Sequence, residues 1–400
     1  MSLRLILGLT SLSIAAWPAS YHFAAVWDGE RVWRDACIAV EGDRIQSVGP
    51  CTGPSTDLTK YTAIPGLIDV HTHMTYVLAN PVARSARAAA TVFLSQDNAR
   101  KTLETGVTTV RDLGSSGYAD IAMRDLIAAG KMVGPRMFVA GYGLQNTRGA
   151  NVTPNTAHGP VEVDKVARAQ VAAGADWVKM YASTGSGQDV TGTQTYSFEE
   201  IKAAADAAHA VGKRIAVHSY GPEAARDAVR AGVDSLEHAT DMDDDTIAEI
   251  ARRKIVYVPT IDHNRYYADN AEGFGFHPGI VAEYNDFIAK NIAMARRALK
   301  AGVKIGVGSD AVYTMAGQNM REMGALVKAG MTPAQALAAA TTTNAAMLGM
   351  EKSLGTIAPG YFADIVAVEG DPLADVSVVF NNVRWVMKGG KVVADKTAAK

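Results

Sequence analysis

The stretch IPGLIDVHTH, residues 64–73, decides the fold prediction because it joins a buried strand to two potential metal ligands. Its continuous apolar run, residues 66–70, is typical of a strand buried on both faces of a parallel sheet. Residues two apart along an extended strand point the same way. His71 and His73 can therefore grip one ion from the end of this strand.

Seven further apolar runs follow this one, separated by alanine-rich helical segments. The predicted strands cover residues 66–70, 107–111, 136–140, 177–181, 214–217, 233–236, 255–258 and 303–307. The predicted helices include residues 198–211, 222–231, 244–253, 332–340 and 343–348, and several helix-to-strand joins carry a glycine where a C-terminal cap would lie: Gly106, Gly212, Gly232 and Gly302. Eight βα units in series predict an α/β fold, a (β/α)8 TIM barrel over residues 65–350.

Both ends of the chain have β patterns and no helical period of this kind. Strands are predicted at residues 21–27, 37–40 and 45–48, and again at residues 365–368, 376–380 and 383–388. We therefore expect residues 20–64 and 351–400 to build one small β-sandwich that flanks the barrel.

The composition excludes several classes of protein. With 48% hydrophobic residues and a net charge of −2 over 400 residues, the chain does not have the composition of a disordered protein. The 39 Lys and Arg against 41 Asp and Glu give no basic excess for nucleic acid or an anionic membrane, which favours a small-molecule substrate. Two cysteines are too few for a thiolate-rich metal site, so imidazole and oxygen ligands must hold any metal.

The N-terminus leaves the compartment open. Residues 1–19 are a candidate signal peptide or N-terminal extension, because Arg4 precedes an uncharged run and residues 13–15 offer a small-x-small cleavage site. If residues 1–15 are a signal peptide the protein is exported to the periplasm, and otherwise it is cytoplasmic. Export would permit a disulfide between Cys37 and Cys51, but the favoured interpretation is two free, partly buried thiols.

Ligand-type side chains stand at the strand ends where barrel enzymes have their active sites. They are His71 and His73 after strand 1, Lys179 in strand 4, His218 after strand 5, His238 after strand 6 and Asp310 after strand 8. Each alone has a structural explanation; Asp310, for example, could cap a helix. Together they predict two divalent ions, with zinc favoured, one on His71, His73 and Asp310 and the second on His218 and His238.

Lys179 stands where an anion is needed between the two metals. A bare ammonium there would repel both cations, but a lysine deprotonated by their field can add carbon dioxide. The resulting carbamate is an effective carboxylate, and we expect it to bridge the two ions.

These motifs resemble the amidohydrolase superfamily, in its binuclear subgroup with a carboxylated lysine. Residues 64–73 resemble its opening signature, and residues 360–366 and 370–373 resemble its return into the small β unit. The runs 106–112, 234–238 and 308–311 are similar to its second, sixth and eighth strands. Within the superfamily the chain is most similar to the Xaa-Pro dipeptidase and carboxypeptidase branch, which is related to imidazolonepropionase.

The resemblance implies a peptidase that acts on dipeptides or N-acyl amino acids through a hydroxide bridging two metals. Asp310 would take the hydroxide proton and deliver it to the leaving amine. Tyr220, at the same-face spacing after His218, resembles the family tyrosine that donates to the developing oxyanion, although it could simply pack at the barrel mouth.

One departure puts the dipeptide assignment in doubt. The branch usually has Gly-Gly-His after strand 3, whereas residues 147–151 here contain no histidine. Arg148 could instead meet a substrate carboxylate, or it is a solvated loop side chain. His263 and Tyr266, in the loop predicted at residues 262–278, are further candidate substrate contacts.

Other functions remain open at this stage. A lactonase, carboxylesterase or phosphotriesterase could use the same binuclear site. A non-catalytic metal-binding protein is the alternative from another class, and a homo-oligomer is compatible with either. Deamination is disfavoured, because Gly221 occupies the place of the glutamate that shuttles protons in the deaminases.

Overall fold

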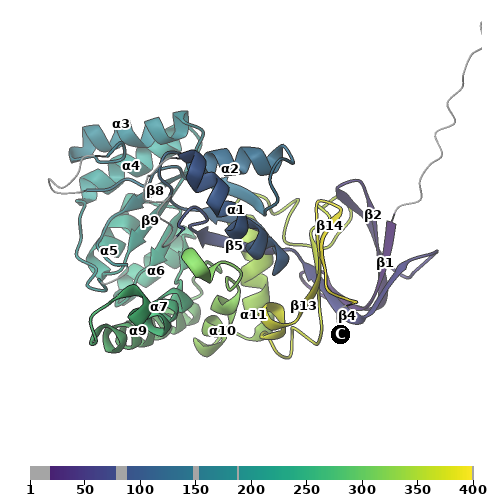
Figure 1. The fold of residues 1–400 in the computed structure, drawn as a ribbon. Helices are drawn as coiled ribbons and strands as arrows, with labels where there is room; N and C mark the ends of the chain where they lie inside the picture. The colour runs from purple at the N-terminus through teal and green to yellow at the C-terminus, as the bar shows by residue number, and fades with distance from the viewer. Residues whose placement is uncertain (1–18, 78–87, 147–152, 187–188, 399–400) are drawn as a thin grey trace, which may run out of the picture.

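The computed structural model describes residues 19–77, 88–146, 153–186 and 189–398, which form two units (Figure 1). A sheet built from both ends of the chain lies beside a larger unit in which helices surround parallel strands. Of the candidate signal peptide, all but Ala19 falls outside the described residues. In the described part of the chain, no helix combines the length and the apolarity that crossing a membrane requires.

The terminal sheet has seven strands in the order β14-β13-β12-β4-β1-β2-β3. Its strands are β1 (Ala19–Trp27), β2 (Val32–Glu41), β3 (Arg44–Gly49), β4 (Thr56–Pro65), β12 (Ile365–Val368), β13 (Val383–Lys388) and β14 (Lys391–Asp395). Phe23 and Ile38 from the first strands share one buried cluster with Trp385 and Met387 from β13. The two ends of the chain therefore make a separate β unit as predicted, but it is one continuous sheet whose halves share a core.

Two local predictions in this sheet are wrong. Residues 376–380 form no strand, because the Asp375 carboxylate accepts from the Ser377 backbone N–H and starts a short helix, α13 (Val378–Asn381). The two cysteines are not free, since Cys37 and Cys51 form a disulfide. Register explains the bond: Cys37 pairs with Gly49 across β2 and β3, which brings Cys51 within 5.0 Å, measured between Cα atoms.

The larger unit contains seven of the eight predicted parallel strands, in two sheets. One sheet has the order β5-β6-β7 and the other β11-β10-β9-β8. Their bounds are β5 (Leu67–Thr72), β6 (Val107–Asp112), β7 (Arg136–Val139), β8 (Trp177–Tyr181), β9 (Arg214–Ser219), β10 (Ser235–His238) and β11 (Val256–Val258). Residues 64–73 run from the end of β4 through β5 and thus connect the two units.

The eighth predicted run, residues 303–307, is not a regular strand. It nevertheless lies between β11 and β5, because Tyr257 N–H donates to the Lys304 carbonyl at 2.9 Å and Val70 N–H donates to the Val307 carbonyl at 3.1 Å. The Asn344 side-chain amide donates to the carbonyls of both Ile68 and Val307. These bonds hold the segment that leads to Asp310 beside the strand that leads to His71.

Helices flank the parallel strands. They are α1 (Ala88–Glu104), α2 (Ala119–Ala128), α3 (Gly159–Ala172), α4 (Phe198–Ala210), α5 (Pro222–Ala231), α6 (Asp244–Arg253), α7 (Ile261–Asp269), α8 (Ala271–Phe274), α9 (Ile280–Lys300), α10 (Arg321–Lys328), α11 (Pro333–Ala338) and α12 (Asn344–Met347), with a π turn at Ala339–Thr343. Local signals fix several ends: Ser197 and Glu200 form a capping box on α4, and Gly232 ends α5 with a positive φ. The expected loop at residues 262–278 is wrong, because most of it forms α7 and α8.

Candidate metal centre

The ends of the parallel strands bring the predicted ligands together. One ligand atom each of His71, His238 and Asp310 lies within 4.8 Å of the others. His73 Nε2 is 3.2 Å from Asp310 Oδ1, and the His218 ring centroid is 4.5 Å from that of His238. All five side chains are buried. The spacing of the sequence and the parallel strands thus produce one cluster of four imidazoles and one carboxylate.

Two of these residues have strained backbones. His238 has φ of 72° and Asp310 has φ of 51°, a left-handed region that costs a non-glycine residue about 1–3 kcal/mol. Hydrogen bonds hold both conformations: the Tyr257 hydroxyl donates to the His238 carbonyl, and Asp310 N–H donates to the His71 carbonyl at 2.7 Å. Such strain persists where the surroundings fix the residue, and it is concentrated at functional sites.

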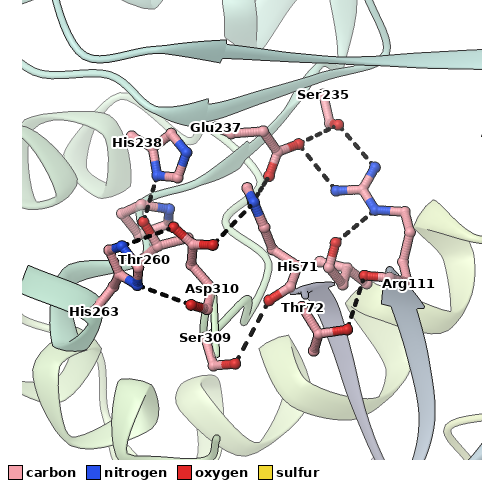
Figure 2. Close-up of polar contacts among 12 residues, drawn as sticks. His71, Thr72, Arg111, Ser235, Glu237, His238, Thr260, His263, Ser309 and Asp310 are labelled. Carbon is pink, nitrogen blue, oxygen red and sulfur yellow. Dashed lines mark hydrogen bonds and ion pairs between the residues drawn. The ribbon is translucent and has the colours of Figure 1, made fainter. Parts of the chain in front are cut away.

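A buried network orients His71 from behind (Figure 2). Glu237 Oε2 accepts from His71 Nδ1 at 2.7 Å, and Glu237 Oε1 accepts from Arg111 and from the Ser235 hydroxyl. Burial raises the pKa of Glu237, but Arg111 and His71 outweigh it and lower that pKa to about 2. An ionised Glu237 requires the proton of His71 on Nδ1, so Nε2 presents its lone pair to the cluster.

Three of the four imidazoles in the cluster are held neutral. Burial lowers the pKa of His71 to about 4 and the pKa of His218 and His238 well below the usual value. Burial also opposes a charge on His73, but its hydrogen bond to Asp310 outweighs burial and raises the pKa of His73. Burial raises the pKa of Asp310, but the neighbouring histidines, His263 first, hold it well below its usual range. Neutral imidazoles beside an ionised carboxylate are the ligands that zinc and related ions prefer.

Lys179 is fully buried, and its amine has no hydrogen-bond partner. Burial lowers the pKa of this amine to about 8, while Glu237 and Asp310 act in the opposite direction. The His71 Nε2 atom is also buried without a hydrogen bond, and its nearest charged neighbour is Asp310 Oδ1 at 3.5 Å. An unpartnered buried amine and imidazole are costly unless something else satisfies them, so the residues present fit a metal group with Lys179 beside it.

A cavity of about 370 Å³ opens onto this cluster. Its described lining includes His73, His218, His238, His263, Asp310, Tyr76, Tyr181, Tyr267, Tyr313, Gln145, Asn146, Ser183 and Thr184. Among the described lining residues Asp310 is the one carboxylate, and no lysine or arginine occurs. The volume and the mixture of aromatic and polar groups suit a small molecule.

The remaining sequence-predicted residues have different positions. The ring of Tyr220 stacks on His218, and its buried hydroxyl has no partner. His263 lines the cavity, but its closest polar contacts are the Asp310 carbonyl, at 2.8 Å from Nδ1, and Asp310 Oδ2, at 3.2 Å from Nε2. The Tyr266 hydroxyl bonds to Thr314, and its neighbour Tyr267 lines the cavity instead. Arg148 lies outside the described residues.

Sequence reasoning missed part of the supporting network. Thr260 contacts His238 Nδ1 through its hydroxyl at 2.6 Å, and nothing in the sequence distinguishes it from other threonines. The sequence analysis assigns no role to Glu237 or Arg111. Arg111 ends one predicted buried strand and Glu237 directly follows another, so their opposite charges are a usable signal, because buried charges are usually paired.

Comparison with known proteins shows the family and the fold of the chain. The profile described as the amidohydrolase family matches residues 62–393. A solved Xaa-Pro dipeptidase with methionine bound in its active site is 31% identical, with a TM-score of 0.85 over 94% of this chain and 99% of that one. A prolidase complexed with n-methylphosphonate-l-proline is 28% identical, with a TM-score of 0.85 over 94% and 100% of the two chains. Ochratoxinase from Aspergillus niger is 28% identical over 373 residues, 82% of this chain and 75% of that protein.

Proposed function

We propose that this chain, which belongs to the amidohydrolase family, hydrolyses the amide bond of dipeptides or N-acyl amino acids at a centre of two divalent ions. The family and its prolidase, dipeptidase and ochratoxinase relatives support a hydrolase of amide bonds. The observation that carries the finer proposal is the cluster of four buried imidazoles and a carboxylate, of which His73, His218, His238 and Asp310 line one small-molecule cavity, together with the buried, unpartnered amine of Lys179.

In this proposal zinc is the preferred ion. His71, His73 and Asp310 would hold one cation and His218 and His238 the second, with the carbamate of Lys179 between them. Two bound cations would lower the pKa of water toward ~7 and polarise the substrate carbonyl.

The residues of the chain would supply the remaining chemistry. Asp310, which lines the cavity, would take a proton from the attacking water and return it to the leaving amine. The Tyr220 hydroxyl is buried without a hydrogen-bond partner among the described residues and would donate to the oxygen of the developing oxyanion. The neutral state of His218 and His238 keeps their lone pairs available for ligation.

The proposal also includes the closure of the barrel and the compartment of the protein. We expect residues 65–350 to act as one closed eight-stranded barrel, with residues 303–307 as the eighth strand. The bonds from Tyr257 and Val70 to this segment support that arrangement. The Cys37–Cys51 disulfide favours the exported alternative, because disulfides persist in oxidising compartments.

A second candidate is hydrolysis of an uncharged ester, lactone or phosphotriester at the same centre. One observation favours it: the described lining of the cavity offers no lysine or arginine to pair with a free substrate carboxylate. The same activated water and the same acid–base group would serve these substrates.

A substrate panel tests the proposal. Protein prepared with zinc and bicarbonate is analysed for metal content and assayed on dipeptides and N-acyl amino acids against lactones and phosphotriesters. We expect two ions per chain and the highest kcat/KM on an amide. Folded protein that holds no metal would contradict the metal centre, and turnover restricted to esters would replace the first candidate with the second.

A further inference from the structure

Two residues at the start of α7 lie against the candidate site. His263 follows Thr260 by three residues, the spacing that places side chains on one face of a helix. Each is at most 1% exposed. The helix itself therefore turns one side toward the strand ends.

The Thr260 hydroxyl holds His238. Its Oγ1 lies 2.6 Å from His238 Nδ1, so the ring nitrogen on the opposite side, Nε2, is the one directed at the cluster. Thr260 has φ of 51°, the same left-handed region as His238. A β-branched residue adopts this conformation only when its surroundings impose it, which indicates that the contact depends on a fixed backbone.

The His263 ring holds Asp310. A carbonyl can only accept, so Nδ1 must donate its hydrogen to the Asp310 carbonyl at 2.8 Å. This bond fixes the tautomer and supports the strained backbone of Asp310. The Nε2 atom then faces Asp310 Oδ2 at 3.2 Å (Figure 2).

The first turn of α7 is itself held from elsewhere in the chain. Glu322, on α10, is fully buried and accepts from the backbone N–H of Ile261 at 3.0 Å and of Asp262 at 2.8 Å. The Asn291 amide, on α9, donates to the carbonyl of Pro259 at 2.8 Å. Two helices thus fix the position of the turn.

We infer that the first turn of α7 is one positioning element, in which Thr260 orients His238 and His263 orients Asp310. The roles of those two partners rest on the proposed function, but the arrangement does not depend on which substrate is cleaved. A single rigid turn thus fixes both of the oriented residues.

Metal binding tests the Thr260 contact without any substrate. Thr260→Val keeps the shape and loses the hydroxyl, whereas Thr260→Ser keeps the hydroxyl. We expect Thr260→Val to weaken zinc binding about 10- to 100-fold in a chelator-competition titration, and Thr260→Ser to stay near the wild type. Equal zinc affinity in all three proteins, each folded by circular dichroism, would overturn this part of the inference.

His263→Asn and His263→Leu test the contact between His263 and the Asp310 carbonyl. The asparagine can still donate to the Asp310 carbonyl, and we expect it to retain more turnover than the leucine at equal zinc content. Asp269→Asn, at the exposed end of α7, is the matched control and should behave as the wild type. If the wild type cleaves no amide, the proposed function fails while the zinc titration still decides the inference. Equal turnover in the two His263 variants would overturn the Asp310 contact.

Discussion

Ten buried side-chain nitrogen or oxygen atoms in the described residues have no hydrogen-bond partner, and none of them belongs to the terminal sheet. All ten lie in the parallel-stranded unit, and five of them surround the candidate site: His71 Nε2, Lys179 Nζ, Tyr220 OH, His263 Nε2 and Asn264 Nδ2. The terminal sheet instead buries apolar residues such as Phe23 and Trp385 and carries the disulfide.

This difference indicates that the terminal sheet serves stability, whereas part of the parallel-stranded unit serves binding. A buried polar atom without a partner costs about 1–3 kcal/mol, so a fold selected for stability alone would satisfy it or replace it. The parallel-stranded unit keeps such atoms where a metal and a substrate would satisfy them. Substitutions at those atoms should therefore change activity more than stability, and substitutions in the terminal sheet should do the opposite.

Lys179→Met should show the largest effect. Methionine has a similar volume and no amine, so it removes the group proposed to lie between the metals. We expect hydrolysis to fall by about 10³-fold or more, with one or both ions lost. The melting temperature should stay the same or rise, because a buried amine without a partner disappears.

Calorimetry, metal analysis and the substrate assay check the Lys179 prediction together. Lys165→Met on the surface of α3 is the control and should match the wild type in all three. Retained turnover in Lys179→Met would remove the lysine from the proposed centre. A melting temperature many degrees lower would show that Lys179 is structural and that the comparison of the two units is too simple.

Glu237→Gln tests a buried polar side chain that has its partners. Glu237 lies in the parallel-stranded unit, and both of its oxygens accept hydrogen bonds. The substitution leaves Arg111 buried without a counter-charge, which should cost about 3 kcal/mol of unfolding free energy. The new amide would also favour a proton on His71 Nε2, so zinc affinity should fall about 10- to 100-fold.

Urea unfolding and a zinc titration measure the two effects of Glu237→Gln. Glu249→Gln offers a matched control, since Glu249 pairs with Arg252 and Arg253 on the surface of α6 and should cost less than about 1 kcal/mol. An equal loss of unfolding free energy in the two variants would mean that the buried Glu237–Arg111 pair stabilises the fold no more than a surface ion pair.

Much of this organisation could be predicted because its signals are local. A Ser197–Glu200 capping box starts α4 and Gly232 ends α5, and both lie within a few residues of the ends that they determine. The candidate ligands could be predicted for a related reason, since parallel strands in series bring their carboxyl ends to one edge wherever the helices lie.

What could not be predicted depends on contacts between distant residues. The first turn of α7 is capped by Glu322, about sixty positions further along the chain, so residues 262–278 have no local helix start and resemble a loop. The disulfide depends on the register of β2 against β3, which the cysteine spacing does not reveal. In residues 376–380 the β-branched pattern favoured a strand, but the Asp375 carboxylate accepts from the Ser377 backbone N–H and forms a turn that leads into α13.

Removing the disulfide should give the opposite result to Lys179→Met. Cys37 and Cys51 are 14 residues apart, and a loop of that length stabilises by about 3 kcal/mol through the unfolded chain. The double variant Cys37→Ala/Cys51→Ala should therefore unfold at lower urea concentration with kcat/KM unchanged. A reduced wild type should match it, and a loss of activity in the folded variant would couple the terminal sheet to the site.

Lys388→Met addresses the junction of the two units and should give the smallest effect. Lys388 ends β13, and its amine donates to the Gly134 carbonyl just before β7, at 2.6 Å. Burial lowers the pKa of Lys388 to about 8, with Arg136 contributing and Asp364 opposing. The unfolded lysine keeps its proton until about pH 10.4, so the folded protein binds fewer protons between pH 8 and 10 and the wild type gains stability there as pH rises.

Lys388→Met lacks this gain because it has no proton to lose. At pH 7 the wild type carries the whole cost of the buried ammonium, and the variant should be more stable by about 1 kcal/mol, a value reduced for the remaining solvent contact. By pH 10 the higher stability of Lys388→Met should vanish or reverse, since the wild-type amine is then neutral and keeps its hydrogen bond to the Gly134 carbonyl. Urea unfolding at pH 7, 8.5 and 10 measures the change, with Lys391→Met on exposed β14 as the control. If the unfolding free energies of the wild type and Lys388→Met change with pH in parallel, the Lys388 amine is as well solvated as a surface lysine. Of the two buried lysines compared, only Lys179 at the candidate metal centre would then destabilise the fold.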